Sequence, residues 1–370
     1  MEIRAAVARR PHAPFSLESL ELGPVRDDEI LVRNVATGIC HTDIAMRDQV
    51  FAVPQPIVLG HEGAGIVEQV GAAVHKVGVG DHVVMSFNSC GACASCQHNL
   101  PSYCHDFFGR NFAGRRSDGS SPLASFAADT RECVHGNFFG QSSFASHSLC
   151  HERNIVKVPK DIALESLGPL ACGIQTGAGA VINAMRIGFG DSIAVFGAGS
   201  VGISAIMAAA AVGASQVIAV DPRQERLDAA RELGASYALT PDGVPDLVAK
   251  IRELSAGGVQ YSFDTTGIPR VLRQALEVLA PRGVCGFVGA APPGTEVSLD
   301  MMDLMTQGKR LQGIVEGESV PDVFIPQMID LHRRGRFPFD RLISYYPFER
   351  INDAIRDSET GHVIKAVIRF

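Results

Sequence analysis

Four closely spaced cysteines constrain this chain more than any other feature of its sequence. They stand in the run CGACASCQHNLPSYC, as Cys90, Cys93, Cys96 and Cys104. Each short gap lets two thiolates turn toward one point, and four thiolates close a tetrahedral shell around zinc. Because a closed shell leaves no position for a substrate, the pattern predicts a structural metal site and not a catalytic one.

Length and composition set the broad class. The chain has 370 residues, enough for two domains. Hydrophobic residues make up 46% of it and charged residues 20%, which predicts a folded chain with a large core. The net charge of -7 disfavours nucleic acid as a partner, because nucleic-acid binding needs a basic surface.

The ends and the apolar stretches indicate a cytoplasmic location. The N-terminal run MEIRAAVARR lacks the long apolar stretch of a signal peptide. We therefore expect thiolates that bind metal and not disulfides, with Cys133, Cys150 and Cys285 as free thiols. Residues 193–220 contain no charged side chain, but glycines divide them into a strand, a turn, a helix and a second strand. No membrane-spanning segment is therefore expected.

The pattern of the chain changes near residue 173. Before that point, short alternating runs such as Glu29–Arg33 and Gly65–Val70 are separated by turn residues, which predicts a mostly β region. After it, strands alternate with helices, which predicts a doubly wound parallel sheet of the α/β class. The strands are expected at Ser192–Val195, Gln216–Val220, Tyr261–Asp264 and Gly283–Val288, and the helices at Ser200–Val212, Pro222–Leu233 and Val271–Leu279.

A glycine-rich turn marks a dinucleotide site. Gly197, Gly199 and Gly202 follow a buried strand and open a helix, so they would allow the tight turn, the approach of a pyrophosphate and close helix–strand packing. The helix N-terminus would offer free N–H groups to the phosphates. Asp221 ends the next strand, where a carboxylate accepts hydrogen bonds from the ribose hydroxyls and favours NAD over NADP. Arg223 and Arg226 weaken that preference, because either could approach a phosphate.

Further segments carry a family resemblance. They are Gly38–Asp43 (GICHTD), Gly60–Gly65 (GHEGAG), the Cys90–Cys104 lobe, Cys172-Gly173 with Thr176-Gly177, and the run through Asp221. With them the chain resembles the zinc-dependent medium-chain alcohol dehydrogenases over essentially its full length. Gly109–Gly114 (GRNFAG) and Phe138–Phe144 (FFGQSSF) make it most similar to the aryl-alcohol (benzyl alcohol) dehydrogenases. The resemblance implies a GroES-like catalytic domain at 1–173, a Rossmann domain at 174–314 and a return to the catalytic domain at 315–370.

The resemblance also implies roles for individual residues. Cys40, His61 and Cys172 would bind a catalytic zinc, leaving the fourth position for substrate. Asp43 would orient His61, and Glu62 would lie beside the metal. Thr42 would accept the alcohol proton before hydride passes to the nicotinamide. The residues expected at the cofactor are His41, Thr176, Gly197, Gly199, Val201, Gly202, Asp221, Arg226 and Lys365.

One position departs from some relatives. Where these carry a proton-relay histidine, this chain has Ala45, which cannot shuttle a proton. We expect the proton to leave through the ribose hydroxyl and water, and an Ala45→His change to raise turnover at neutral pH.

The substrate is less constrained than the chemistry. Seven phenylalanines fall between Phe107 and Phe144, and Ser86 stands where some relatives carry a large aromatic, so primary aromatic or allylic alcohols are favoured. The alternatives are a terpenoid (geraniol-type) alcohol dehydrogenase and a glutathione-dependent formaldehyde dehydrogenase, for which Arg110, Arg115 and Arg116 could hold carboxylates. A regulator without turnover would have a damaged ligand set, and a zinc-free quinone reductase of this fold would lack Cys40. The run Lys309–Val315 is expected to form an edge strand that pairs in a homodimer or homotetramer.

Overall fold

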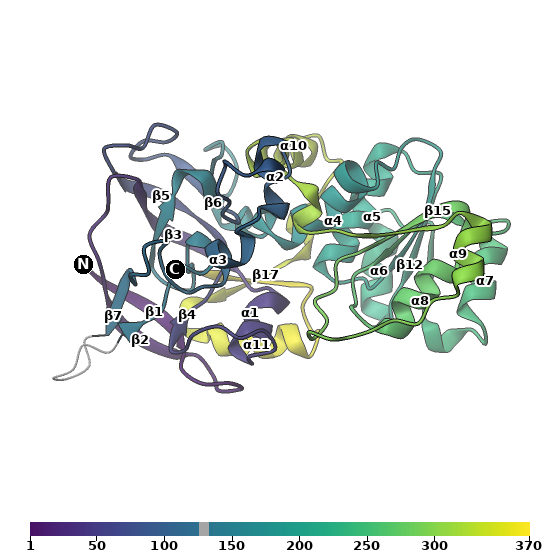
Figure 1. Ribbon diagram of the computed structural model, residues 1–370, viewed down its shortest axis with the longest axis horizontal. Helices are drawn as coiled ribbons and strands as arrows, with labels where there is room; N and C mark the ends of the chain where they lie inside the picture. The colour runs from purple at the N-terminus through teal and green to yellow at the C-terminus, as the bar shows by residue number, and fades with distance from the viewer. Residues whose placement is uncertain (126–132) are drawn as a thin grey trace. The chain divides into compact units, whose positions relative to one another are not determined.

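The computed structural model describes residues 1–125 and 133–370, which form two compact units (Figure 1). Of the described residues, the first unit holds those of Met1–Cys172, Val320–Gln327 and Asp340–Phe370, and the second holds Gly173–Ser319 and Met328–Phe339. The stretch 315–370 therefore does not return to the first unit as one piece. One cause is Arg336, whose side chain donates to the Ala211 carbonyl within the second unit.

One sheet of the first unit has five strands among the described residues. Their order is β4-β1-β2-β7-β8, and neighbouring strands are antiparallel. The strands are β1 (Glu2–Ala8), β2 (Ser16–Leu22), β4 (Ile57–Val58), β7 (Leu123–Ser125) and β8 (Cys133–Val134).

A second sheet positions the residues of interest. In the described chain it has seven strands, ordered β10-β6-β5-β3-β18-β17, with β9 also paired to β3. They are β3 (Glu29–Gly38), β5 (Glu62–Val70), β6 (His82–Met85), β9 (His147–His151), β10 (Ile155–Lys157), β17 (Ile343–Pro347) and β18 (Lys365–Arg369). Val367 of β18 lies opposite Gly38 at the end of β3. The last strand of the chain therefore lies beside the segment that leads into Cys40.

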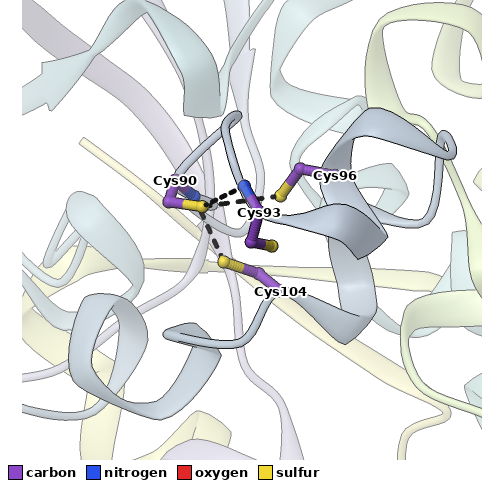
Figure 2. A group of neighbouring side chains, drawn as sticks. All are labelled: Cys90, Cys93, Cys96 and Cys104. Carbon is purple, nitrogen blue, oxygen red and sulfur yellow. Dashed lines mark hydrogen bonds between the residues drawn. The ribbon is translucent and has the colours of Figure 1, made fainter.

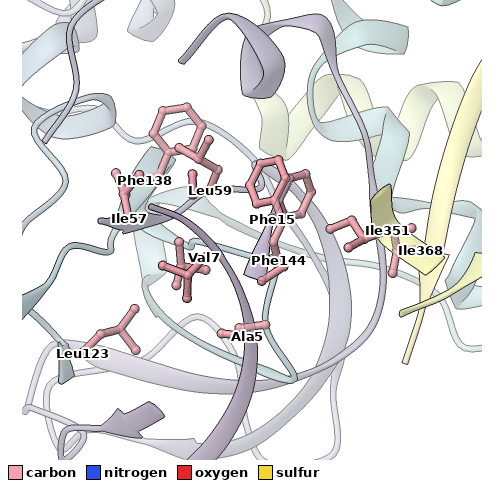
Figure 3. Close-up of a cluster of buried hydrophobic side chains, with 14 of the residues drawn as sticks. Ala5, Val7, Phe15, Ile57, Leu59, Leu123, Phe138, Phe144, Ile351 and Ile368 are labelled. Carbon is pink, nitrogen blue, oxygen red and sulfur yellow. The ribbon is translucent and has the colours of Figure 1, made fainter. Parts of the chain in front are cut away.

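The core of this unit draws on distant parts of the chain (Figure 3). Ala5 and Val7 of β1, Ile57 and Phe138 pack in one buried cluster. The same cluster includes Ile351 and Ile368, from the C-terminal part of the chain. Burial of this apolar surface holds the C-terminal segment in the unit.

Four helices belong to the first unit, and a fifth spans both units, within the described residues. They are α1 (His41–Arg47), α2 (Ala94–Gln97), α3 (Phe107–Asn111) and α11 (Ile351–Glu359), and the spanning helix is α10 (Pro321–Arg333). Helix α1 begins after Cys40, whose backbone N–H donates to Asp43 Oδ2 at 3.0 Å. This carboxylate satisfies a donor that the helix leaves open and so fixes the turn that carries Cys40.

The second unit is built on a parallel sheet. Its strand order is β13-β12-β11-β14-β15-β16, the doubly wound order that was expected. The strands are β11 (Ser192–Phe196), β12 (Gln216–Val220), β13 (Tyr237–Leu239), β14 (Val259–Asp264), β15 (Leu279–Phe287) and β16 (Arg310–Gly313). The helices are α4 (Gly173–Gly179), α5 (Ser200–Val212), α6 (Gln224–Glu232), α7 (Leu247–Leu254), α8 (Pro269–Glu277) and α9 (Met301–Gln307). The bounds of α5 and β12 are the predicted ones.

The first residues of helices α6 and α8 differ from those predicted from the sequence. Helix α6 starts at Gln224 and not at Pro222, because Arg223 is extended and its N–H donates to Asp221. Helix α8 starts at Pro269, since proline suits the first turn, and Leu279 already belongs to β15. In the part of the chain that the structure describes, no helix is long and apolar enough to cross a membrane.

Candidate active site and metal centres

The four-cysteine lobe brings its thiols together (Figure 2). The Sγ atoms of Cys90, Cys93, Cys96 and Cys104 all lie within 4.8 Å of one another. Helix α2 follows directly after Cys93 and carries Cys96, while Cys104 follows a single helical turn. All nine cysteines of the chain are free, so these four are available as metal ligands.

Backbone N–H groups prepare this cluster for metal. Those of Ala92 and Cys93 donate to Cys90 Sγ at 3.4 and 3.2 Å, and they lower the pKa of Cys90 to about 6. Burial instead raises the pKa of Cys104 to about 11. Donors directed at sulfur stabilise thiolates, and four sulfurs at this spacing fit zinc in a closed site.

A second cluster forms around His61. Ligand atoms of Cys40, His61, Glu62 and Cys172 lie within 4.8 Å of one another. His61 Nε2 is 3.3 Å from Cys172 Sγ. The hydrogen bond from Cys172 lowers the pKa of Cys40 well below its usual value, although burial opposes it. Within the described residues, this cluster and the lobe are the two groups with metal-binding geometry.

Asp43 determines which nitrogen of His61 faces the thiols. Its Oδ1 lies 2.8 Å from His61 Nδ1 and also accepts the Gly60 N–H at 3.0 Å. With Nδ1 held by a carboxylate, the lone pair of Nε2 is directed at Cys40 and Cys172. Both Asp43 and His61 are buried. A neutral imidazole and two thiolates with an adjoining position are the donor set of an open zinc site.

Glu62 does not stand alone beside this cluster. Lys365 Nζ lies 2.7 Å from both of its carboxylate oxygens and donates to the Ile39 carbonyl at 3.0 Å. The structure therefore engages the Lys365 amine in a buried ion pair. A role for Lys365 at the cofactor phosphates stays a prediction.

Helix α1 carries the residues expected to handle the proton. Thr42 Oγ1 lies 3.7 Å from Cys40 Sγ, beside the cluster. His41 is exposed at the start of the helix, whereas Ala45 is buried. An imidazole at position 45 would have to displace its neighbours, so the Ala45→His expectation applies only if the helix can accommodate it.

Aromatic rings cover one face of His61. The Phe139 ring stacks on the imidazole with centroids 4.5 Å apart and an angle of 29°. Phe138 meets the imidazole edge-on at 5.7 Å, and Phe112 lies 5.1 Å from Phe139. Six of the seven phenylalanines noted in the sequence are described; Phe126 lies outside the described residues. Ser86 is fully buried, and its hydroxyl donates to the Ala171 carbonyl.

The glycine-rich turn has the geometry that the sequence predicted. Gly197 has φ +92°, a conformation that favours glycine. A side chain at Gly202 would collide with the Gly197 carbonyl, whereas one at Gly199 would meet only the Arg226 guanidinium, at 3.9 Å. Val201 follows at the N-terminus of α5, a helix of 13 residues. The turn thus leaves room for a phosphate over free helical N–H groups.

Polar side chains surround this turn. Asp221 accepts the N–H groups of Ala198 and Arg223 at 2.8 and 2.9 Å, so its carboxylate also holds the turn. Arg226 Nη1 lies 3.8 Å from Asp221, and its Nε has no partner among the described groups. Thr176 Oγ1 donates to Glu316 at 3.4 Å. Roles for these side chains at a cofactor stay predictions.

Comparison with known proteins gives the family. Residues 26–160 match the alcohol dehydrogenase GroES-like domain, and residues 200–333 match the zinc-binding dehydrogenase family. The geraniol dehydrogenase of Castellaniella defragrans is 47% identical over 368 residues, which are 99% of this chain and 97% of that protein. The chain belongs to the zinc-dependent medium-chain alcohol dehydrogenase family. The two metal clusters fit zinc, and the nucleotide-binding fold of the second unit fits NAD, as the cofactors of this alcohol dehydrogenase.

Solved structures agree with this assignment. An alcohol dehydrogenase zinc-binding domain protein from Burkholderia ambifaria is 51% identical, with a TM-score of 0.97, and the match covers 100% of this chain and 99% of the other. The benzyl alcohol dehydrogenase of Acinetobacter calcoaceticus is 45% identical, with a TM-score of 0.96 and the same coverage. The fold and family predicted for this alcohol dehydrogenase are therefore confirmed.

Sequence reasoning missed Gln141. This amide is buried, and it contacts the backbone at the His61 carbonyl and the Gly63 N–H, directly after the imidazole-bearing residue. Its only signal was its place in the segment FFGQSSF, which drew attention for its phenylalanines. Nothing in the spacing of Gln141 and His61 could have paired them.

Proposed function

We propose that this alcohol dehydrogenase oxidises primary aromatic or allylic alcohols to aldehydes, with NAD as hydride acceptor. The observation that carries the proposal is the open cluster of Cys40, His61 and Cys172, with Thr42 beside it. Two named relatives support the substrate class, since one acts on geraniol and the other on benzyl alcohol. The Phe139 ring, buried in the core, stacks on His61 and makes that side of the metal cluster apolar.

The chain's own residues would prepare the reaction. Cys40, His61 and Cys172 would hold the catalytic zinc, and Asp43 keeps His61 in the ligating tautomer. When bound, zinc supplies a Lewis acid for the substrate oxygen, and NAD supplies the hydride acceptor. The Thr42 hydroxyl would accept a hydrogen bond from the alcohol and pass its own proton on to the ribose hydroxyl and water. The stacked phenylalanines would exclude water from the imidazole face.

The cofactor would bind at the glycine-rich turn. The N–H groups at the start of α5 would contact the pyrophosphate above Gly199. Asp221 would accept the ribose hydroxyls, and Arg226 would add positive charge beside it. The carboxylate of Asp221 favours NAD over NADP, because a 2′-phosphate would be repelled.

The position of Arg116 disfavours the alternative of a glutathione-dependent formaldehyde dehydrogenase. Arg116 is bound by Glu29 at the start of β3, through its Nε and at 3.0 Å through its Nη2. Cys40 follows the other end of β3, about 30 Å away at about 3.3 Å per residue of strand. Arg110 and Arg115 line the same pocket of about 280 Å³ as Arg116. Arg116 is therefore engaged at the end of β3 opposite to Cys40.

NADH formation with purified, zinc-loaded enzyme tests the proposal. The substrates compared are benzyl alcohol, geraniol, ethanol and formaldehyde with glutathione. We expect the largest kcat/KM for benzyl alcohol or geraniol, and at least tenfold less for ethanol, because a larger apolar substrate can bury more area on binding. Turnover that requires glutathione would reject the proposed substrate class.

We also propose a homodimer or homotetramer in the cytoplasm. Among the described strands, β16 pairs only with β15, so one edge is open to a second copy. Exposed Leu311 lies on this strand, and exposed Met301, Met302 and Met305 lie on α9. An open apolar edge favours pairing. Light scattering of the purified protein distinguishes a monomer from these assemblies.

A further inference from the structure

We propose that Gln141 is a positioning residue for the metal cluster, acting through the backbone of His61 and of Cys172. The proposal rests on zinc being held by Cys40, His61 and Cys172, as proposed above. Gln141 has no ligand atom in the cluster, and it is only 2% exposed. Its effect on the cluster would therefore pass entirely through hydrogen bonds to the chain.

The Gln141 amide holds the chain directly after His61. Its Nε2 donates to the His61 carbonyl at 3.0 Å, and its Oε1 accepts the Gly63 N–H at 3.1 Å. One planar group thus fixes the two successive peptide groups that follow the ligand, on either side of Glu62. Because Asp43 holds the imidazole at the other end, the position of His61 is determined from backbone and side chain together.

The same amide continues toward Cys172. Gln141 Nε2 also lies 2.9 Å from the Met85 carbonyl and 3.3 Å from the Ser86 carbonyl. The Ser86 hydroxyl donates to the Ala171 carbonyl at 2.7 Å, one residue before Cys172. A chain of hydrogen bonds therefore joins two ligand segments that are more than a hundred residues apart in sequence. Such a connection would hold the distance between His61 and Cys172 in the absence of metal.

The segment that carries Gln141 is itself held in an unfavourable conformation. Phe139 and Ser142 have φ of +50° and +51°, a region that is strained for residues with side chains. Backbone hydrogen bonds from Ser143 to Gly60 and from Phe144 to Leu59 keep the segment in place. This conformation stacks Phe139 on the imidazole and directs Gln141 at its backbone. Strain that persists beside a cluster of ligands is consistent with a positioning role.

A purely structural role predicts something different. Gln141 would then only satisfy buried carbonyl and N–H groups, and its loss would lower stability without any specific effect on metal. Asn111 provides the matched control, since it is fully buried and also bridges a backbone N–H and carbonyl, both of Asn88. Asn111 lies on α3, and among the described residues its side chain bonds the backbone of Asn88 and Phe107 and not that of His61 or Cys172.

The experiment measures release of zinc to a chromophoric chelator from the intact enzyme. Wild type should carry two zinc ions per chain. We call the group of Cys40, His61 and Cys172 the mixed cluster. A His61→Ala variant should lack the phase in which zinc leaves the mixed cluster, and this identifies that phase. We expect Gln141→Leu to speed that phase by about tenfold, the effect typical of groups that orient metal ligands. Asn111→Leu should leave the same phase within a factor of two of wild type.

A gentler variant keeps the test valid if Gln141→Leu fails to fold. Ser86→Ala removes one hydroxyl and should speed release from the mixed cluster several-fold. Its effect should not multiply with that of Gln141→Leu, because both residues act in one network. Equal release in wild type, Ser86→Ala and Gln141→Leu would overturn the proposal, as would equal acceleration by Asn111→Leu. A wild-type enzyme with only one zinc would instead overturn the proposed metal site.

Discussion

Lys365 and Glu62 form a buried ion pair beside the mixed metal cluster. The ammonium nitrogen lies 2.7 Å from each carboxylate oxygen, and the two side chains are 2% and 0% exposed. Lys365 begins β18, while Glu62 directly follows His61 and begins β5. The pair therefore links the C-terminal strand to the segment that carries a metal ligand. Lys365 also holds the Glu62 carboxylate in place. Without this amine, the carboxylate would compete with the substrate for the metal.

Removing one partner of the Lys365–Glu62 ion pair should lower the free energy of unfolding more than removing both partners. A Lys365→Met change leaves Glu62 charged and buried, and we expect the free energy of unfolding to fall by about 3–5 kcal/mol. The double change Lys365→Met with Glu62→Gln should recover most of that loss, because no unpaired charge remains. Urea unfolding followed by circular dichroism measures both variants. Equal destabilisation of the single and double variants would mean that the ion pair is not the cause.

The four-cysteine lobe should depend on its metal for stability. A Cys96→Ser change removes one thiolate from the closed shell, and we expect zinc content to fall from two ions per chain to about one. Metal binding contributes to folding free energy, so the melting temperature should fall as well. Elemental analysis and thermal unfolding measure the two effects. A Cys133→Ser variant, which changes an exposed thiol outside both clusters, is the control.

Local patterns in the sequence predicted the second unit well. Its strands are continuous apolar runs, and its glycines mark the turn before α5. The hydrophobic pattern and the glycine positions were therefore enough to predict the bounds of α5 and β12. The lobe was equally accessible, because its four ligands lie within 15 residues of chain. In these regions the interactions that determine structure are close in sequence.

The surroundings of His61 could not be predicted in this way. Gln141 and Lys365 approach the His61–Glu62 segment from 80 and 303 residues away. The Lys365 contact depends on how strands of one sheet are arranged, and the Gln141 contact on how the turn before β9 folds against that sheet, which no local pattern encodes. The resemblance to a family predicted Lys365 at the cofactor phosphates, which stays a prediction, and its ion pair with Glu62 was not foreseen. Contacts of this kind need the three-dimensional arrangement.

Arg226 should contribute to cofactor binding and selectivity. Its guanidinium stands beside Asp221 and above Gly199, with Nε unpartnered among the described residues. We expect Arg226→Ala to weaken NADH binding by about tenfold, the value of one hydrogen bond to a charged group. Binding of NADPH should weaken more, because a 2′-phosphate adds charge near the same guanidinium. Fluorescence titration with both nucleotides measures the ratio of the NADH and NADPH affinities. If Arg226→Ala leaves this ratio unchanged, Arg226 does not lie near the ribose.

Acid should weaken the attachment of α1. Arg47 forms a two-point bond to Asp48, at 2.6 and 2.9 Å, and also reaches Glu359 at 3.0 Å. The Arg47 hydrogen bond lowers the pKa of Asp48 below its ordinary value. A carboxyl whose pKa is lower in the folded state stabilises the fold above its unfolded pKa, about 3.9, and this contribution is lost as the pH falls through the folded pKa.

The free energy of unfolding of Asp48→Asn should therefore differ from that of wild type at neutral pH and not in acid. We expect the variant to lose about 1 kcal/mol of unfolding free energy at pH 7, a value reduced by partial solvent screening. The difference should shrink below a pH of about 4 and vanish once Asp48 is protonated in the folded enzyme. Urea unfolding across this range measures it. A difference that persists undiminished in acid would show that the Asp48 charge does not support α1.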